Sequence, residues 1–287
     1  MPVGSIGDIT IARVLEMHYP FDRLEFFPGT TEEDWAPHMD WLIAEGGVDA
    51  ATKMMNLPIQ SYLVRTSHHT ILIDTCAGND KERPHRPGWH KKTDDSYLRA
   101  LAAEGLAPED IDYVMCTHLH LDHVGWNTRL IDGRWVPTFP NAKYVMSKKD
   151  VDLLNAESNP AALLPYTDSV LPVIEAGQVQ LVSNDFALDD EVWLEPSPGH
   201  TPDHFSVKLA SNGKGAVMGG DLMQCPVPEW AARPDWDVDL ARATRRQFME
   251  KYSQTDELVC MAHFPLPSVG RIVAENGAFR FRYDDVT

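Results

Sequence analysis

Short runs of apolar residues, many of them alternating with polar ones, follow each other along most of the chain and favour a β-rich fold. Residues 9–14 alternate and predict the first strand, and residues 61–65 and 70–74 predict a strand pair around a short polar turn. Similar runs predict further strands at residues 113–116, 134–136, 143–146, 179–182, 192–194, 205–209, 215–221, 258–262, 271–273 and 279–282.

Helical patterns occupy the intervals between these runs. Residues 96–104 predict a helix that ends at Gly105, and residues 240–254 predict a charged amphipathic helix. A third helical stretch, residues 148–174, is interrupted by three prolines. We therefore expect one domain over residues 1–287 with insertions near residues 18–57 and 148–176. The first insertion is rich in aromatic residues, and two interpretations stay open: a segment packed on the core, or a lid that forms an apolar substrate wall.

Composition limits the classes of function. A chain of 287 residues with 43% hydrophobic residues can bury a large core. The net charge of −18 argues against a nucleic-acid partner, since phosphates require basic surfaces. No apolar run has the length of a membrane span, and the N-terminus lacks the pattern of a secretory signal. With four widely spaced cysteines, a cytoplasmic protein with a small-molecule substrate is expected, and a homodimer stays open.

Residues 117–125 concentrate side chains that bind metals. His118, His120, Asp122 and His123 follow directly on the apolar run 113–116. Neutral imidazole and carboxylate are zinc ligands. In extended backbone, residues two apart project to the same side, so His118 and His120 can converge on one ion. After the chain turns, Asp122 and His123 can face a second ion. This density favours a metal centre over a histidine-rich surface turn.

Three candidate ligands occur further along the chain, again where predicted strands end. His200 lies in a Pro/Gly-bounded turn, Asp221 ends the run 215–221, and His263 follows the run 258–262. Each alone would be an ordinary turn or capping residue. Together with the first motif, they give four strand ends that present ligand types.

At this point the sequence resembles the metallo-β-lactamase superfamily, whose HxHxDH motif is followed by a distant histidine, a bridging aspartate and a last histidine. The resemblance extends over nearly the whole chain and implies an α+β fold, the αββα four-layer sandwich. It also implies the roles of the ligands: the first ion on His118, His120 and His200, the second on Asp122, His123 and His263, and Asp221 as the bridge.

The resemblance implies a hydrolase with two divalent ions per chain, for which zinc is expected, although manganese, iron or cobalt also suit such ligands. A hydroxide that bridges the ions would attack a small apolar lactone or ester. Asp221 would hold the ions at a fixed separation, and Asp122 would take a proton during turnover. A phosphotriester hydrolase and a non-catalytic metal-binding sensor or effector are the alternatives. The complete ligand set favours the enzyme.

Residues around the ligands carry further predictions. Asp74, at the end of the strand 70–74, is predicted to orient a ligand histidine, whereas His204 is predicted to be a packed structural residue. Related homoserine lactonases have a tyrosine three residues after the bridging aspartate, and Gln224 stands there in this chain. A preference for acyl homoserine lactones is therefore not expected. The predicted substrate wall consists of Phe26, Phe27, Trp35, Met54, Met55, Trp126 and Gln224.

Overall fold

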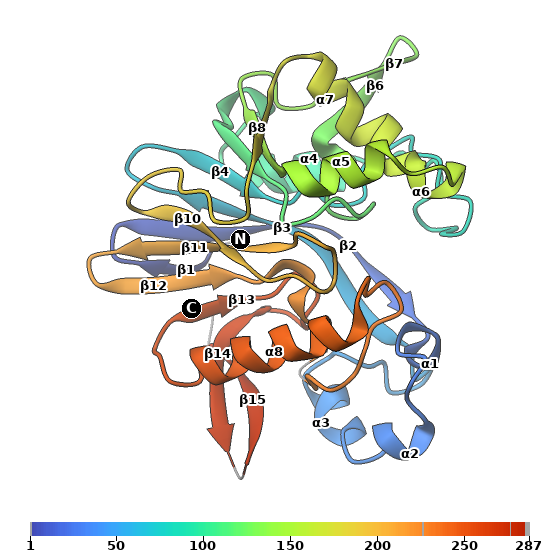
Figure 1. Ribbon diagram of the computed structural model, residues 1–287, viewed down its shortest axis with the longest axis vertical. Coiled ribbons are helices and arrows are strands. Elements are labelled where there is room, and N and C mark those ends of the chain that lie inside the picture. Colours follow the sequence, from blue (N-terminus) through green and yellow to red (C-terminus); the bar gives the residue numbers. More distant parts are fainter. Residues whose placement is uncertain (1, 226, 276, 285–287) are drawn as a thin grey trace.

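Two β-sheets lie face to face in the computed structural model, which describes residues 2–225, 227–275 and 277–284 (Figure 1). The first sheet has the strand order β1-β2-β3-β4-β5-β8-β9, and the second has the order β10 to β15. The first sheet consists of β1 (Pro2–Ile6), β2 (Ile9–Phe21), β3 (Met55–Arg65), β4 (Thr70–Ile73), β5 (Tyr113–Met115), β8 (Lys143–Ser147) and β9 (Val179–Val182). The second consists of β10 (Val192–Pro196), β11 (Phe205–Ser211), β12 (Lys214–Met218), β13 (Leu258–Cys260), β14 (Val269–Glu275) and β15 (Ala278–Tyr283).

Helices and a separate hairpin complete the fold. The hairpin pairs β6 (Thr128–Ile131) with β7 (Arg134–Pro137). The α-helices are α1 (Arg23–Phe26), α2 (Glu32–Trp35), α3 (Met39–Ala44), α4 (Ser96–Ala103), α5 (Lys148–Asn155), α6 (Pro160–Pro165), α7 (Leu171–Glu175) and α8 (Val238–Tyr252). Shorter helical turns are η1 (Pro108–Asp110), η2 (Gly125–Asn127), the π-helical η3 (Tyr166–Val170) and η4 (Gly220–Leu222). Within the described ranges, no helix is long and apolar enough to cross a bilayer.

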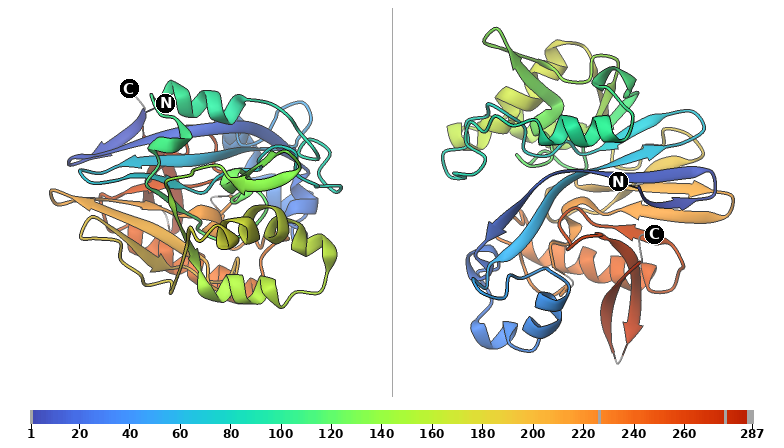
Figure 2. Two further views of the ribbon diagram at one scale, coloured as in Figure 1. Left: turned by 90° about the horizontal axis from the view of Figure 1, so that it is seen from above. Right: turned by 180° about the vertical axis from the view of Figure 1, so that it is seen from behind.

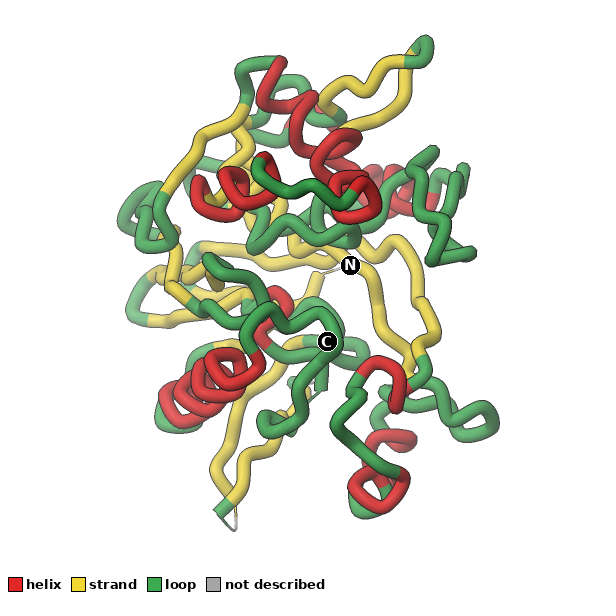
Figure 3. Tube along the Cα trace, turned by 45° about the vertical axis from the view of Figure 1, so that its right-hand side comes forward, coloured by secondary structure: helices red, strands yellow, loops and turns green. Residues whose placement is uncertain are grey.

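Buried side chains form layers on both faces of each sheet. Alternate residues of the two sheets, such as Val64 and Val207, meet in an inner core. The outer face of the first sheet packs against Leu101 of α4, and the outer face of the second packs against Phe248 of α8. Helices therefore cover both outer faces, as Figures 1 and 3 show. The predicted αββα four-layer sandwich is confirmed.

The strands differ from the sequence prediction mainly near the N-terminus. β2 continues to Phe21 and β3 begins at Met55, so the segment between them is residues 22–54 and not 18–57. A β-bulge between Leu15 and Met17 interrupts the alternation, which explains why the sequence pattern ended early. The first strand is β1 and not residues 9–14. It lies at the edge of the first sheet.

The two long segments outside the strand pattern occupy different positions. Residues 148–176 form α5, α6, η3 and α7 and contribute to the core on the outer face of the first sheet. Residues 22–54 carry α1 to α3 and pack against Cys225 and the loop at residues 227–232. Figure 2 shows these N-terminal helices beside the C-terminal part of the chain. The N-terminal segment therefore contacts the loop that follows Asp221.

Candidate metal centre

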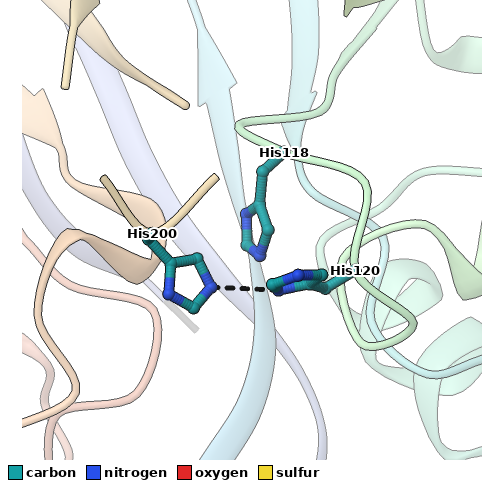
Figure 4. A group of neighbouring side chains, drawn as sticks. All are labelled: His118, His120 and His200. Atoms are coloured by element: carbon teal, nitrogen blue, oxygen red, sulfur yellow. Dashed lines mark hydrogen bonds between the residues drawn. The ribbon is translucent and has the colours of Figure 1, made fainter. Parts of the chain in front are cut away.

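The ligand candidates converge at one edge of the two sheets. His118 and His120 lie in the loop after β5, and His200 lies in the turn between β10 and β11. Their side chains point toward one another in Figure 4. One ring nitrogen from each lies within 4.8 Å of the others, and His200 Nε2 is 3.0 Å from His120 Nδ1. Three imidazoles with this spacing form one group that can hold an ion.

A second group lies beside the first. Asp122 and His123 continue the same loop, and His263 follows β13. One ligand atom from each lies within 4.8 Å of the others. His263 Nε2 is 3.3 Å from His123 Nε2 and 3.5 Å from Asp122 Oδ2. These residues therefore form a mixed group of two imidazoles and a carboxylate.

The Asp221 carboxylate lies between the two groups. Its Oδ2 is 3.4 Å from His200 Nε2 and 3.9 Å from His118 Nε2. Its Oδ1 is 2.9 Å from His263 Nε2 and 3.1 Å from His123 Nε2. Each carboxylate oxygen thus faces one group. This is the geometry that a carboxylate shared by two cations requires.

The donor atoms also fit cations chemically. The buried Nε2 atom of His118 has no hydrogen-bond partner among the described residues, although buried polar atoms are usually paired. The close nitrogen pairs, His200 with His120 and His123 with His263, are unfavourable unless a proton or a cation lies between their lone pairs. Imidazole nitrogens and carboxylate oxygens are ligands that zinc accepts. The residues therefore fit two divalent ions.

Hydrogen bonds fix which ring nitrogen faces the centre for most of the candidate histidines. In four of the histidines, Nδ1 lies next to an acceptor, so a proton on Nδ1 leaves the Nε2 lone pair free. These pairs are His118 with the Thr117 hydroxyl (3.1 Å), His123 with Asp74 Oδ2 (2.8 Å), His200 with Asp235 Oδ1 (3.0 Å) and His263 with the Pro58 carbonyl (2.8 Å). Asp74 also accepts from the Thr117 amide at 2.8 Å, so it is placed where it orients a candidate ligand.

Burial and the carboxylates set the protonation of the centre in opposite directions. Burial lowers the pKa of His120 to about 3, so this imidazole stays neutral. Burial also acts to lower the pKa of His123 and of His263, but the nearby carboxylates, Asp221 foremost, together outweigh it and raise both. Burial acts to raise the pKa of Asp221, and the two histidines hold it well below its usual value. Without a cation, the raised pKa values of His123 and His263 favour protons on these rings, which offset the negative charge of Asp221 and its neighbouring carboxylates.

The residues of the centre differ in their exposure. His118, His123, His200, Asp221 and His263 are all buried, whereas His120 and Asp122 are half-buried. Two hollows of about 660 Å³ each lie away from these residues, one between α3 and β15 and the other beside β11 and β12. His120 and Asp122 are therefore the more exposed residues of the centre.

The turn that carries Asp221 depends on glycine and on His204. Gly220 has φ +51°, and a Cβ atom there would lie 2.6 Å from the Thr117 hydroxyl oxygen. The buried His204 accepts a hydrogen bond from the Asp221 amide with Nε2 (3.2 Å), and its Nδ1 is 2.8 Å from the Ser197 hydroxyl. His204 is thus a packed structural histidine, as predicted, and it also supports the backbone of the central aspartate.

The aromatic N-terminal segment is mainly a small core of its own. Phe27, Trp35 and Met55 are at most 3% exposed, while Phe26 and Met54 are half-buried. The ring centroids of Trp35 and Trp230 lie 4.3 Å apart. A crevice of about 10 Å³ between this core and His263 has no room for a substrate. The geometry therefore favours a segment packed on the core over a lid. Phe26 and Met54 are its half-buried apolar side chains.

Trp126 and Gln224 do not face an open cleft, which departs from the sequence prediction. The Trp126 ring stacks on Tyr97 of α4 with centroids 5.2 Å apart, and its Nε1 donates to Glu16 at 2.6 Å. Gln224 is 3% exposed, and its Nε2 donates to the Asp221 carbonyl at 2.9 Å. Both side chains are therefore engaged in internal contacts, because polar partners lie beneath the surface at both positions.

Sequence reasoning missed two residues next to the centre, Asp235 and Arg245. Asp235 contacts His200, and Arg245 of α8 forms an ion pair with Asp235 at 3.0 Å. Burial acts to raise the pKa of Asp235, but His200 and Arg245 hold it below its usual value. Nothing in the local pattern distinguishes Asp235 from the neighbouring acidic residues of this loop, so only the fold reveals its partner.

Sequence comparisons find proteins related to this chain. The sequence profile of the metallo-beta-lactamase superfamily matches residues 55–263. The N-acyl homoserine lactonase AiiA of Bacillus thuringiensis subsp. kurstaki is 24% identical over 180 residues, 58% of this chain and 64% of AiiA. The uncharacterised protein YobT of Bacillus subtilis is 27% identical over 170 residues, 58% of this chain and 63% of YobT. The match thus spans less than two thirds of the length of these relatives.

Solved structures show the same fold over the whole chain. AidC, a dizinc quorum-quenching lactonase in complex with a product, has a TM-score of 0.82 and 19% identity, covering 100% of this chain and 98% of AidC. A probable metal-dependent hydrolase from Staphylococcus aureus has a TM-score of 0.78 and 20% identity, covering 98% and 99%. With the profile match over more than half of its length, the chain belongs to the metallo-beta-lactamase superfamily.

Proposed function

We propose that this protein is a hydrolase with two divalent ions, most suitably zinc, that opens a small apolar lactone or cleaves a small apolar ester. The observation that carries the proposal is the Asp221 carboxylate, which directs one oxygen to each of two groups of three ligands. Sites with two ions about 3.5–4 Å apart use such shared ligands. The relatives named as homoserine lactonases support a small-molecule substrate.

The residues around the centre suit hydrolysis. When bound, the two ions would act as Lewis acids and lower the pKa of water toward about 7. Asp122 is half-buried on the accessible side, with Oδ2 3.5 Å from His263 Nε2. From there its carboxylate can accept a proton from the attacking water and pass it to the leaving oxygen. Asp221, fully enclosed, serves to hold the ions.

Gln224 bears on the choice among substrates. Its amide already donates to the Asp221 carbonyl, so this position offers no hydroxyl donor for a developing oxyanion. One such donor contributes roughly 3–4 kcal/mol to transition-state stabilisation. A strong preference for acyl homoserine lactones is therefore not part of the proposal. We propose moderate activity on apolar or aryl esters and simple lactones.

A substrate panel tests the proposal. We expect hydrolysis of an aryl ester and a γ-lactone, lost on chelation and restored by zinc. Failure to hydrolyse any substrate, in protein that carries both ions, would instead support a sensor or effector. Fastest turnover of an aryl phosphotriester would favour the alternative hydrolase. A long-chain acyl homoserine lactone that reacts more than about a hundredfold faster than the others, roughly 2.7 kcal/mol, would contradict the inference from Gln224.

A further inference from the structure

A buried ion pair lies directly behind one of the candidate ligands. The Asp235 side chain is completely buried, and its Oδ1 lies 3.0 Å from His200 Nδ1. Its Oδ2 accepts from Arg245 and from the Ala232 amide, both at 3.0 Å. Arg245 is 2% exposed and also donates from Nε to the Pro228 carbonyl at 3.0 Å. Both oxygens of this carboxylate therefore have fixed donors.

Main-chain contacts hold the same segment against the His200 turn. The Trp236 amide donates to the His200 carbonyl at 3.1 Å, and the Asp237 amide donates to the Gly199 carbonyl at 3.0 Å. Gly199 approaches α8 so closely that a Cβ atom there would lie 2.4 Å from the Ala241 nitrogen. Residues 235–237 and the start of α8 thus fix both the backbone and the ring of His200.

A stabilising role for the folded state is a weak explanation of this pair. Removing two charges from water costs several kcal/mol per ion, which their attraction often only offsets. The contact with His200 gives the pair another use. A carboxylate held in one plane keeps the proton on His200 Nδ1 and orients Nε2 toward Asp221, 3.4 Å away.

We propose that Asp235, held by Arg245, is a positioning residue for His200 and sets the affinity of the group His118, His120 and His200 for its ion. This inference rests on the proposed function only in requiring that the group binds a metal. Asp235 contacts one group alone, since Nδ1 of His123 and of His263 have other partners, Asp74 and the Pro58 carbonyl. Loss of Asp235 therefore lowers the affinity for one ion and leaves the affinity for the other unchanged.

The test is titration of metal-free, full-length protein with Zn²⁺ or Co²⁺ against a competing chelator. Asp235→Asn keeps the volume but removes the charge and places an amide next to Arg245. We expect one of the two affinities to fall by about 10- to 100-fold and the other to change by less than about twofold. The visible spectrum of bound Co²⁺ should change for the weakened ion only.

Asp168→Asn is the matched control. Asp168 forms another buried ion pair, with Arg83 at 2.7 Å, and its other contacts are with Lys81, Thr128 and Ser169. This variant should lower the unfolding temperature and keep both metal affinities. Equal loss of affinity in the control, or wild-type affinity for both ions in Asp235→Asn, would overturn the proposal.

A second variant covers the case in which Asp235→Asn does not fold. Arg245→Lys keeps the positive charge but cannot donate to both Asp235 and Pro228 in the same geometry, so a smaller loss at the same ion is expected. Unchanged affinities in this variant would also contradict the positioning role. Metal binding is measured without a substrate, so the result does not depend on hydrolysis. The positioning role of Asp235 and the hydrolase proposal can therefore fail independently of each other.

Discussion

At the scale of single residues, the centre is organised by the negative charge of Asp221. This carboxylate is surrounded by four imidazole nitrogens within 3.9 Å, two from each group. It is buried, so its charge is poorly screened by water. In the proposed centre Asp221 would therefore contribute to both ions at once, whereas each of the other ligands would contribute to one.

Asp221→Asn removes this charge with little change in volume. We expect turnover to fall by about a hundredfold or more and both ions to be retained more weakly, since one neutral amide cannot offset two cations. The measurement is kcat at saturating zinc together with the metal content after dialysis. Turnover equal to that of the wild type at saturating metal would show that Asp221 is not the shared ligand.

The sequence could predict the seven candidate ligands because each follows an apolar run that becomes a strand. The structure brings six of them into two adjacent groups and places Asp221 between these groups. The sequence alone could not predict the contacts of Asp235 or Gln224, because their partners depend on how two loops pack. Trp126 was expected near the cleft because of its position in the chain, but its indole instead donates a hydrogen bond to the buried carboxylate of Glu16.

At the scale of elements, the loop at residues 227–237 connects the N-terminal segment to His200. Trp230 contacts Trp35 and Phe27, with centroids 4.3 and 5.8 Å apart, and the Arg233 amide donates to the Phe26 carbonyl at 2.7 Å. The same loop carries Asp235. Packing of the N-terminal helices therefore supports the loop that orients a candidate ligand.

Trp230→Ala tests this connection. Loss of a partly buried tryptophan should lower the free energy of unfolding by about 2–4 kcal/mol. Because the loop loosens, the affinity for one ion should also fall several-fold. Trp135→Ala is the control. Trp135 lies in the β6–β7 hairpin and is also half-buried, but its ring packs on Lys81. Chemical denaturation and zinc titration give both quantities. Equal effects of the two variants on metal affinity would contradict the connection.

The elements themselves were predictable to different degrees. β11, α4 and α8 have clear periodicity, and their predicted bounds agree with the structure to within two residues. β2 and β3 extend seven and six residues further than predicted, since a bulge and a proline obscure their alternation. The α1 to α3 segment could not be assigned from its composition, because aromatic residues serve equally in a packed core or a binding wall.

At the scale of the whole molecule, the centre joins the two sheets at one edge. His118, His120, Asp122 and His123 come from the loop after a strand of the first sheet, whereas His200, Asp221 and His263 come from loops of the second. The two sheets also share one inner core, from which we infer a single domain. With a net charge of −18, the chain has an additional electrostatic reason to favour bound cations.

Two ions held between the sheets should therefore stabilise the whole fold. Elemental analysis of protein purified without chelators should give about two equivalents per chain. Free zinc at about a hundred times the dissociation constant adds roughly 2.7 kcal/mol of stability per site, so chelation should lower the urea midpoint and zinc should restore it. Hydrogen exchange should quicken on chelation in the ligand loops of both sheets, and much less in the β6–β7 hairpin. One equivalent in a fully loaded preparation, or faster exchange in the loops of one sheet only, would contradict a shared centre, because ions that join two sheets must protect both.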